Sequence, residues 1–245
     1  MNYPQKIISF ALNTVFPIKC VGCGAFSSQN RHDYLCKSCL RTIPVKTDFQ
    51  CIGCNKNSSL GKTCLECKNN FAVDQLFTVS DYKNRLVEKA IKTLKYRMVS
   101  EIADSLEPIF KKYLAGLAKD KKIDILADNP LLIPVPLHYR RLNLRGFNQA
   151  EVIAQKISEI LLCKLKPNIL SRKVFSKPQA YIEDREQRLK NIKNIFKLNF
   201  PSEVKNRNII LIDDICTTGA TLNEAAKVLK EGGAKKVVGF VIARG

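Results

Sequence analysis

The chain has 245 residues, of which 45% are hydrophobic and 26% are charged, a balance typical of a globular protein with a buried core. No apolar run approaches the roughly 20 residues that a membrane-spanning helix needs, so no transmembrane segment is predicted. The formal net charge of +19 exceeds the magnitude of about 2–8 typical of a small domain and favours a polyanionic partner, either nucleic acid or a phosphorylated substrate.

The first 19 residues contain a short apolar stretch between residues 7 and 16. This stretch lacks the small-residue cleavage site of a secretory signal peptide. We interpret residues 1–19 as an amphipathic helix that packs on the body of the protein. Attachment of this helix to a membrane surface is the alternative.

Eight of the ten cysteines lie between residues 20 and 67, and all eight stand in C-x-x-C pairs. A gap of two residues lets both sulfurs of a knuckle face one metal ion, which is typical of zinc sites. The pairs are Cys20/Cys23, Cys36/Cys39, Cys51/Cys54 and Cys64/Cys67. Because thiolates reserved for a metal are typical of a reducing compartment, we expect a cytoplasmic protein.

These cysteines predict a duplicated double zinc ribbon over residues 20–70, with two zinc ions. The simplest assignment joins neighbouring pairs, and interleaved pairing is the alternative. Four sulfur ligands leave no position for a substrate water, so a structural role is favoured over a catalytic one. Metal binding would also supply folding free energy to a segment too polar to bury its own core.

From residue 71 to the end of the chain, strand-like and helix-like patterns alternate. This alternation predicts an α/β domain over residues 71–245, a parallel sheet flanked by helices. The predicted strands are 75–82, 131–135, 169–174, 207–212 and 236–243, and the predicted helices are 84–96, 101–117, 148–162 and 221–230. Ligands of such sheets bind at the carboxyl ends of the strands.

The most specific signal is the string Ile209-Ile-Leu-Ile-Asp-Asp-Ile-Cys-Thr-Thr-Gly-Ala-Thr221. A buried strand runs into two carboxylates, Asp213 and Asp214, and a loop of small residues then opens a helix. The loop and the helix start point backbone N–H groups at a phosphate, and the carboxylates accept from vicinal hydroxyls or hold Mg²⁺. A ribose 5-phosphate meets both demands. The predicted phosphate loop consists of Cys216, Thr217, Thr218, Gly219, Ala220 and Thr221.

This string resembles the phosphoribosyl-diphosphate (PRPP) motif of type I phosphoribosyltransferases. The resemblance implies that Asp213 and Asp214 hold the ribose hydroxyls while residues 216–221 hold the 5-phosphate. Cys216 is one candidate nucleophile, but we favour a backbone role for it because of its place in a phosphate loop.

The same resemblance implies a pyrophosphate loop after the strand 131–135. Its residues are Val135, Pro136 and Leu137. Arg140, Arg141 and Arg145 follow and suit bidentate contacts to phosphate. We expect His138 to cap a helix or face solvent rather than act as a general base.

The polar segment from residue 177 to residue 196 corresponds, by the same resemblance, to a mobile hood that closes over PRPP. Long polar segments of this kind in compact domains are functional or disordered. We assign Arg188 to a positive charge that reaches the pyrophosphate on closure.

With the cysteines included, the sequence resembles the ComF family (ComFC), the competence-associated phosphoribosyltransferase-like proteins of bacteria. The shared strings are Leu94-Lys-Tyr-Arg97, Arg145-Gly-Phe-Asn-Gln149 and the hood residues Gln179, Arg188 and Asn191. The resemblance covers nearly the full chain. It implies a cytoplasmic role in natural transformation, handling incoming single-stranded DNA, with proteins of the competence machinery as partners.

Three functions remain as alternatives. An active enzyme would displace pyrophosphate from C1 of PRPP, with Mg²⁺ on the pyrophosphate and an unidentified acceptor. A nucleic-acid-binding protein, favoured by the charge and the zinc ribbons, would keep PRPP as a regulatory or vestigial ligand. Its candidate stacking aromatics, Phe26, Tyr34 and Phe49, are each interpreted as local core. A small-molecule enzyme of nucleotide salvage would need neither the zinc ribbons nor the charge.

Overall fold

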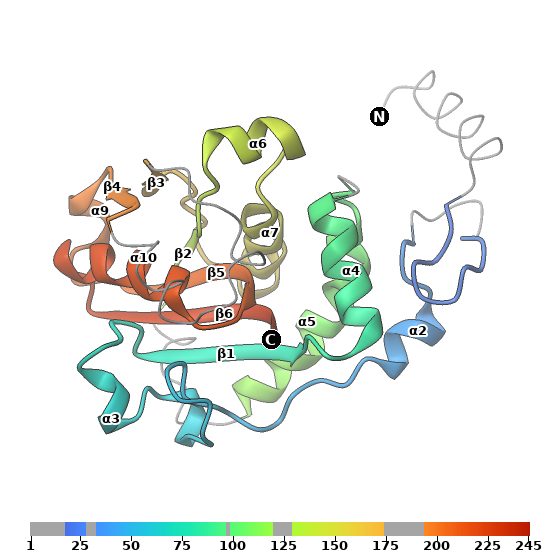
Figure 1. Cartoon of the computed structure of the whole chain (residues 1–245), viewed down its shortest axis with the longest axis horizontal. Helices are drawn as coiled ribbons and strands as arrows, with labels where there is room; N and C mark the ends of the chain where they lie inside the picture. Colours follow the sequence, from blue (N-terminus) through green and yellow to red (C-terminus); the bar gives the residue numbers. More distant parts are fainter. Residues whose placement is uncertain (1–17, 28–32, 97–98, 120–128, 174–193) are drawn as a thin grey trace.

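The computed structural model describes residues 18–27, 33–96, 99–119, 129–173 and 194–245. Its centre is a four-stranded parallel sheet in the order β1-β6-β5-β2. The four strands are β1 (Gln75–Asp81), β6 (Lys236–Arg244), β5 (Asn208–Cys216) and β2 (Leu131–Pro134). The predicted parallel sheet flanked by helices is therefore confirmed (Figure 1).

Successive residues of each strand point to opposite faces of the sheet, and each face has its own apolar core. One core contains Phe77, Ile210 and Phe240 together with α4 (Arg85–Tyr96), α5 (Ile102–Ala118) and α7 (Gln149–Leu161). The other contains Leu76, Leu211 and Val241 together with α10 (Ala220–Glu231). Strands buried on both faces explain the continuous apolar runs of β2 and β5.

Strand β5 runs further than the sequence predicts. Its pairing with β6 continues through Asp213 to the register pair Cys216 and Arg244. The two carboxylates therefore lie inside the last part of the strand rather than after it. The prediction ended the strand early because it relied on apolar character, whereas main-chain pairing with β6 tolerates polar side chains at a strand end.

Three elements near the sheet were not predicted. Helix α6 (Tyr139–Arg145) has no buried residue, so it shows no apolar stripe in the sequence. Strand β4 (Phe196–Leu198) is short and pairs antiparallel with β3 (Leu170–Arg172). The short helix α9 (Pro201–Val204) follows β4.

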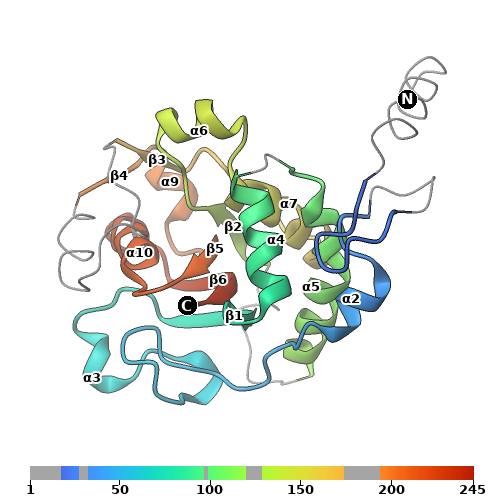
Figure 2. The ribbon, with the colours of Figure 1, turned by 45° about the vertical axis from the view of Figure 1, so that its right-hand side comes forward.

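The cysteine-rich part of the chain, up to Lys68, runs along the outside of the domain that contains the central sheet (Figures 1 and 2). It contains α2 (Lys37–Thr42), the 3-10 turn η1 (Ser59–Gly61) and α3 (Leu65–Lys68). In both views α2 lies beside α5, whereas α3 lies on the far side of the molecule, next to β1. Of the helices that the structure describes, none is long and apolar enough to cross a membrane. Residues 1–17 of the predicted N-terminal helix and residues 177–193 of the predicted hood fall outside the described residues. Of the remainder, Lys19 forms an antiparallel bridge with Phe26 rather than a helix, and Phe196 begins β4.

Candidate functional site

A cavity of about 370 Å³ opens at the carboxyl ends of β2 and β5. Its walls come from the segments after β1 and β2, from β5 with its following loop and the start of α10, and from α4, α6, α7 and β3. The charged lining residues are Lys92, Lys95, Arg141, Arg145, Arg172, Asp213 and Asp214. Five cations thus face two carboxylates, so the cavity suits an anionic ligand.

The acidic pair is held tightly. Asp213 accepts a hydrogen bond at Oδ1 from the Asp214 backbone N–H (2.8 Å), and Asp214 pairs with Lys95 Nζ at 2.9 Å. Burial, reinforced by the neighbouring Asp214 carboxylate, raises the pKa of Asp213 to about 7. Burial alone would lower the pKa of Lys95, but the Asp214 carboxylate outweighs it and the pKa is raised. Asp214 is therefore neutralised by a lysine, while Asp213 stays ready to change its charge near neutral pH.

The loop after β5 turns at Gly219 into the N-terminus of α10. Gly219 has a φ of 77°, and its carbonyl accepts the backbone N–H of Asn223 in the first turn of α10. Thr217 and Thr221 line the main cavity, while Cys216, Gly219 and Ala220 line a small adjoining hollow. Thr218 lines neither, and its Oγ1 accepts from the Ala220 backbone N–H (3.4 Å).

Cys216 is buried, and burial raises the pKa of its thiol to about 11. The thiolate is the nucleophilic form of cysteine, so a buried thiol with a raised pKa is a poor nucleophile. This environment agrees with the backbone role favoured from the sequence.

The arginines around the cavity repel one another. Burial, followed by the charge of Arg141, lowers the pKa of Arg172 to about 10; burial and Arg145 likewise lower that of Arg141. Arg145 donates to Gln149 Oε1 (2.9 Å) and lies over the Tyr96 ring, 5.5 Å from its centroid. Such crowding of like charges costs free energy that a bound anion would recover.

Most of the predicted phosphate-side residues meet in this cavity. Those that line it are Val135, Pro136, Leu137, Arg141, Arg145, Asp213, Asp214, Thr217 and Thr221. Arg140 does not; it is exposed, and its guanidinium lies over the Tyr139 ring. His138 caps α6, where its Nδ1 accepts from the Arg140 backbone N–H (3.3 Å), and it is buried rather than facing solvent. Arg188 lies outside the described residues.

Several cavity residues received no role from the sequence, among them Lys92, Lys95, Tyr96 and Arg172. Lys95 sits directly after Leu94, the last residue of the apolar stripe of α4. A lysine at the edge of a buried helix face was the available signal, and only the tertiary structure reveals its partner Asp214. Arg172 is the last residue of β3, a strand of three residues that contains no recognisable sequence motif.

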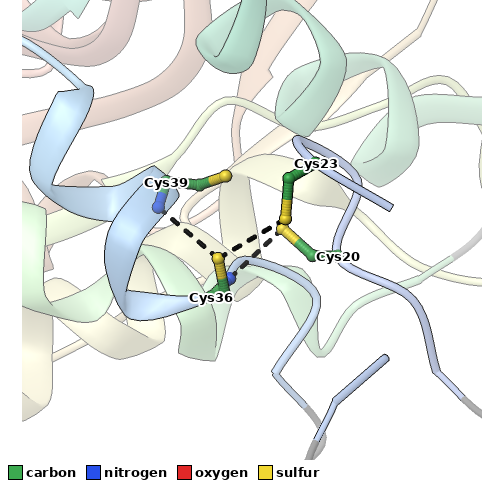
Figure 3. Close-up of side chains that lie close together, drawn as sticks. All are labelled: Cys20, Cys23, Cys36 and Cys39. Carbon is green, nitrogen blue, oxygen red and sulfur yellow. Dashed lines mark hydrogen bonds between the residues drawn. The ribbon is translucent and has the colours of Figure 1, made fainter. Parts of the chain in front are cut away.

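The eight paired cysteines form two clusters. Within each cluster the four sulfurs lie within 4.8 Å of one another. The first cluster is Cys20, Cys23, Cys36 and Cys39, and the second is Cys51, Cys54, Cys64 and Cys67. The predicted grouping of neighbouring pairs is therefore confirmed, and the pairs are not interleaved. Figure 3 shows the first cluster.

The sulfur spacing fits a tetrahedral zinc site. A zinc–sulfur bond of about 2.3 Å places two ligand sulfurs about 3.8 Å apart. The Sγ atoms of Cys23 and Cys36 are 3.7 Å apart, and those of Cys54 and Cys64 are also 3.7 Å apart. Burial would raise the pKa of Cys20, but backbone N–H groups from Cys36 and from its own knuckle lower it to about 6. Backbone N–H groups lower the pKa of Cys51 to about 6 in the same way, whereas burial and the neighbouring cysteines raise the pKa of Cys39 and of Cys67 to about 12.

The aromatic residues of the cysteine-rich part differ in exposure. Tyr34 and Phe49 pack against the core, and Phe49 meets Phe77 edge to face, as expected. Phe26 was expected to be local core, and that prediction is wrong. Its side chain is 64% exposed, with Lys19 Nζ 4.9 Å from the ring centroid. The small fold of a metal knuckle has no interior in which to bury a phenyl ring at this position.

Comparison with known proteins gives consistent matches. Residues 145–244 match the family model described as a phosphoribosyl transferase domain. The chain is 33% identical to the DNA utilization protein YhgH of Escherichia coli O157:H7 over 170 residues, covering 69% of this chain and 72% of that protein. It is 27% identical to competence protein F of Haemophilus influenzae over 231 residues, covering 88% and 99% of the two chains. Competence protein ComFC of Bacillus subtilis is 28% identical over 221 residues, with 86% and 84% covered.

Proposed function

Because the chain belongs to the ComF family of phosphoribosyltransferase-like competence proteins, we propose that its cavity at the carboxyl ends of β2 and β5 binds PRPP with Mg²⁺. The observation that carries this proposal is the meeting of an acidic pair, the turn at Gly219 into α10 and five cations around one cavity. A neutral ligand would leave the mutual repulsion of these cations uncompensated. A phosphorylated sugar satisfies all three groups at once.

The residues divide among the parts of the ligand. Backbone N–H groups of residues 216–221 and the hydroxyls of Thr217 and Thr221 would hold the 5-phosphate at the start of α10. Asp213 and Asp214 would accept from the ribose hydroxyls. The segment after β2, together with Arg141, Arg145 and Arg172, would take the pyrophosphate, and Arg188 would join it from the hood.

Group transfer at this site would break the bond between C1 of the ribose and the pyrophosphate oxygen, which leaves with the electron pair. An acceptor nucleophile would form the new bond to C1 and lose its proton. Bound Mg²⁺ would neutralise the charge of the pyrophosphate as a leaving group. The arginines would hold this group in place, and Asp213 would stabilise the positive charge that develops on the ribose. The acceptor is left open.

Calorimetry with PRPP and Mg²⁺ tests the binding proposal. We expect the wild-type protein to bind only when Mg²⁺ is present. Changing Asp213→Asn and Asp214→Asn together should weaken binding at least about 100-fold, because each charge-assisted hydrogen bond contributes roughly 1.5–3 kcal/mol. Asp48→Asn with Asp104→Asn is the matched control, since both side chains are more than half exposed and lie outside the cavity. Equal affinity in the wild type and the cavity variant would refute the ribose assignment.

We further propose that the protein handles single-stranded DNA in the cytoplasm, with proteins of the competence machinery as partners. The net charge of +19 and the relatives named for DNA utilization and competence support this. A groove of about 550 Å³ at the opposite, amino-terminal edge of the sheet offers a surface for it. Four of its lining residues are lysines, and none forms an ion pair within the described part of the chain: Lys62, Lys68, Lys235 and Lys236.

Fluorescence anisotropy with a labelled single strand, at low and moderate salt, tests this second proposal. Binding should weaken steeply with salt, with a slope of about −0.7 per phosphate contact. Changing the four groove lysines to Gln should weaken binding more than the same change at four lysines outside the groove, namely Lys37, Lys111, Lys112 and Lys119. Undetectable binding at low salt, or binding insensitive to salt, contradicts the DNA proposal.

A further inference from the structure

We propose that the Cys51 knuckle (residues 51–54) positions the phosphate loop, with Ile52 and Arg244 as the positioning residues, and that the Cys20 knuckle (residues 20–23) does not. Metal in the second cluster would then control the anion-binding geometry of a site that contains none of its ligands. The part of this inference that concerns PRPP rests on the proposed function. The part that concerns the loop does not.

Arg244 ties the knuckle to β6, the strand that pairs with the end of β5 just before the loop. It is the last residue of β6, and its side chain is buried. Its Nη1 donates to the carbonyl of Cys51 (2.9 Å), and its Nη2 donates to the carbonyl of Ile52 (2.6 Å) and to Asn55 Oδ1. The register partner of Arg244 is Cys216, the first residue of the phosphate loop. One buried guanidinium therefore joins the knuckle to the start of the loop.

Ile52 forms the floor beneath the loop. Its side chain is completely buried. A Cβ atom placed on Gly219 would lie 2.7 Å from Ile52 Cγ1 and 3.2 Å from Phe71 Cε1. The loop backbone thus rests directly on two apolar side chains of the cysteine-rich segment. The positive φ of Gly219 and this close approach both require glycine at that position.

Asn223 adds a third link, from α10. Its Oδ1 accepts the backbone N–H of Ala72 (2.6 Å), and its Nδ2 donates to the carbonyl of Asn70 (2.9 Å). The backbone N–H of Asn223 in turn donates to Gly219 O (2.8 Å). The segment just after Cys67 is therefore hydrogen-bonded to the helix turn that closes the phosphate loop.

The charge of a metal-bound second cluster would affect the contact between Arg244 and the Cys51 knuckle. A zinc ion with four thiolate ligands carries a net charge of −2. The buried Arg244 guanidinium, which contacts only neutral oxygens, lies beside the second cluster and would be compensated by that charge. Loss of the metal would reduce the negative charge beside the guanidinium and remove the constraint on the knuckle carbonyls.

The Cys20 knuckle provides a matched control within the same chain. Val21 occupies the position equivalent to Ile52, and Gly22 that of Gly53. A Cβ on Gly22 would meet Leu86 of α4 and Cys39 of its own cluster, not the phosphate loop. This unit is joined to the body through the backbone N–H of Tyr34, which donates to Ser105 Oγ (3.1 Å).

The test is amide hydrogen exchange of residues 216–221 in the PRPP-free protein, followed by calorimetry with PRPP and Mg²⁺. Ile52→Ala should speed exchange in the loop and weaken PRPP binding, each by at least about tenfold, because the loop loses its floor. Val21→Ala should change both by less than about twofold. Arg244→Lys, which keeps the charge but loses the bidentate fork, should show an intermediate effect and guards against a misfolded Ile52 variant.

Loop exchange in Ile52→Ala and Arg244→Lys equal to that of the wild type overturns the inference. So does an equal acceleration by Val21→Ala. If the wild-type protein binds no PRPP, the proposed function fails, but the exchange measurement still decides whether the knuckle positions the loop.

Discussion

The two cysteine units have nearly the same local geometry and quite different surroundings. In each unit an antiparallel bridge flanks the first knuckle, between Lys19 and Phe26 in one and between Gln50 and Asn57 in the other. Each knuckle is followed by a residue in the left-handed conformation, Gly24 at a φ of 76° and Asn55 at a φ of 65°. The duplication read from the sequence is therefore a duplication of backbone structure as well.

The surroundings set the two units apart. The first unit packs on the core that contains α4 and α5, and Cys23 is exposed. Ile52 of the second unit belongs to the core that contains α10, and Cys51 and Ile52 are both completely inaccessible. A repeated motif thus fixes how a knuckle folds, but only its tertiary contacts decide whether it supports another site.

The largest expected effect comes from removing a ligand of each cluster in turn. Wild-type protein should carry two zinc ions, and Cys36→Ser and Cys64→Ser should each retain one, by elemental analysis. Both variants should lose stability, because metal binding contributes folding free energy. Cys64→Ser should lose on the order of 2–3 kcal/mol more, since it also leaves the buried Arg244 uncompensated.

Thermal unfolding at one protein concentration provides the measurement. Equal losses of stability in the two variants would mean that the clusters are energetically equivalent despite their different burial. A wild-type protein that is folded and free of zinc would show that neither cluster needs the metal for folding, which contradicts the prediction.

The next largest effect is the pH dependence that Asp213 gives to the free energy of unfolding. The folded-state pKa of Asp213, at about 7, lies above the value of about 3.9 of an unfolded aspartate. Its contribution to stability is therefore full below about pH 4 and is lost as the pH rises through 7. Asp213→Asn should unfold like the wild type at pH 4 and be more stable at pH 8 by roughly 1–2 kcal/mol, discounted from about 1.4 kcal/mol per pKa unit for partial exposure.

Asp33→Asn, in the first unit, is the control for this pH dependence. We expect it to change the free energy of unfolding by less than about 0.5 kcal/mol at either pH, because its carboxylate has no hydrogen bond or ion pair within the part of the chain that the structure describes. If Asp213→Asn were destabilising at pH 8, the carboxylate would be stabilised by Lys95 and the arginines more than it is penalised by burial.

Much of the fold could be predicted because its signals are local. The apolar runs of β2 and β5 and the stripe of α7 are visible in the sequence, and the string 209–221 indicates a strand, a turn and a helix. The cysteine pairs predicted their own grouping, since a short linker brings neighbouring knuckles together most easily. These features depend on residues near one another in the chain.

The missing features depend on distant residues. Lys95 meets Asp214 across more than one hundred positions, and Ile52 meets Gly219 across still more. Tyr139 and Leu144 of helix α6 are exposed, so the sequence shows no buried apolar face that would predict this helix. The division at residues 19 and 70 stays a prediction, and so do the roles of the N-terminal helix and Arg188, which lie outside the described residues.

The smallest effect concerns the left-handed residue that follows each knuckle. Asn55 adopts a positive φ, and its Oδ1 accepts from Arg244. Asn55→Gly keeps the backbone conformation at no steric cost but removes this acceptor from a charged donor, so we expect a loss of about 1.5 kcal/mol, at the lower end for such bonds. Gly24→Asn is the reciprocal change in the first unit. Nothing lies within 4 Å of a Cβ at Gly24, and asparagine tolerates the left-handed region, so this change should cost only about 0.5 kcal/mol or less.

Urea unfolding of the two variants measures this difference. If Asn55→Gly and Gly24→Asn have the same small cost, the Arg244 contact with Asn55 contributes nothing, and the knuckle is held by the two backbone carbonyls alone. A large cost for Gly24→Asn would show instead that the first unit has contacts at this turn beyond those of its described residues. A cost confined to Asn55→Gly would confirm that the two turns share a conformation, and that only the second is tied to β6, the strand paired with the one that leads into the phosphate loop.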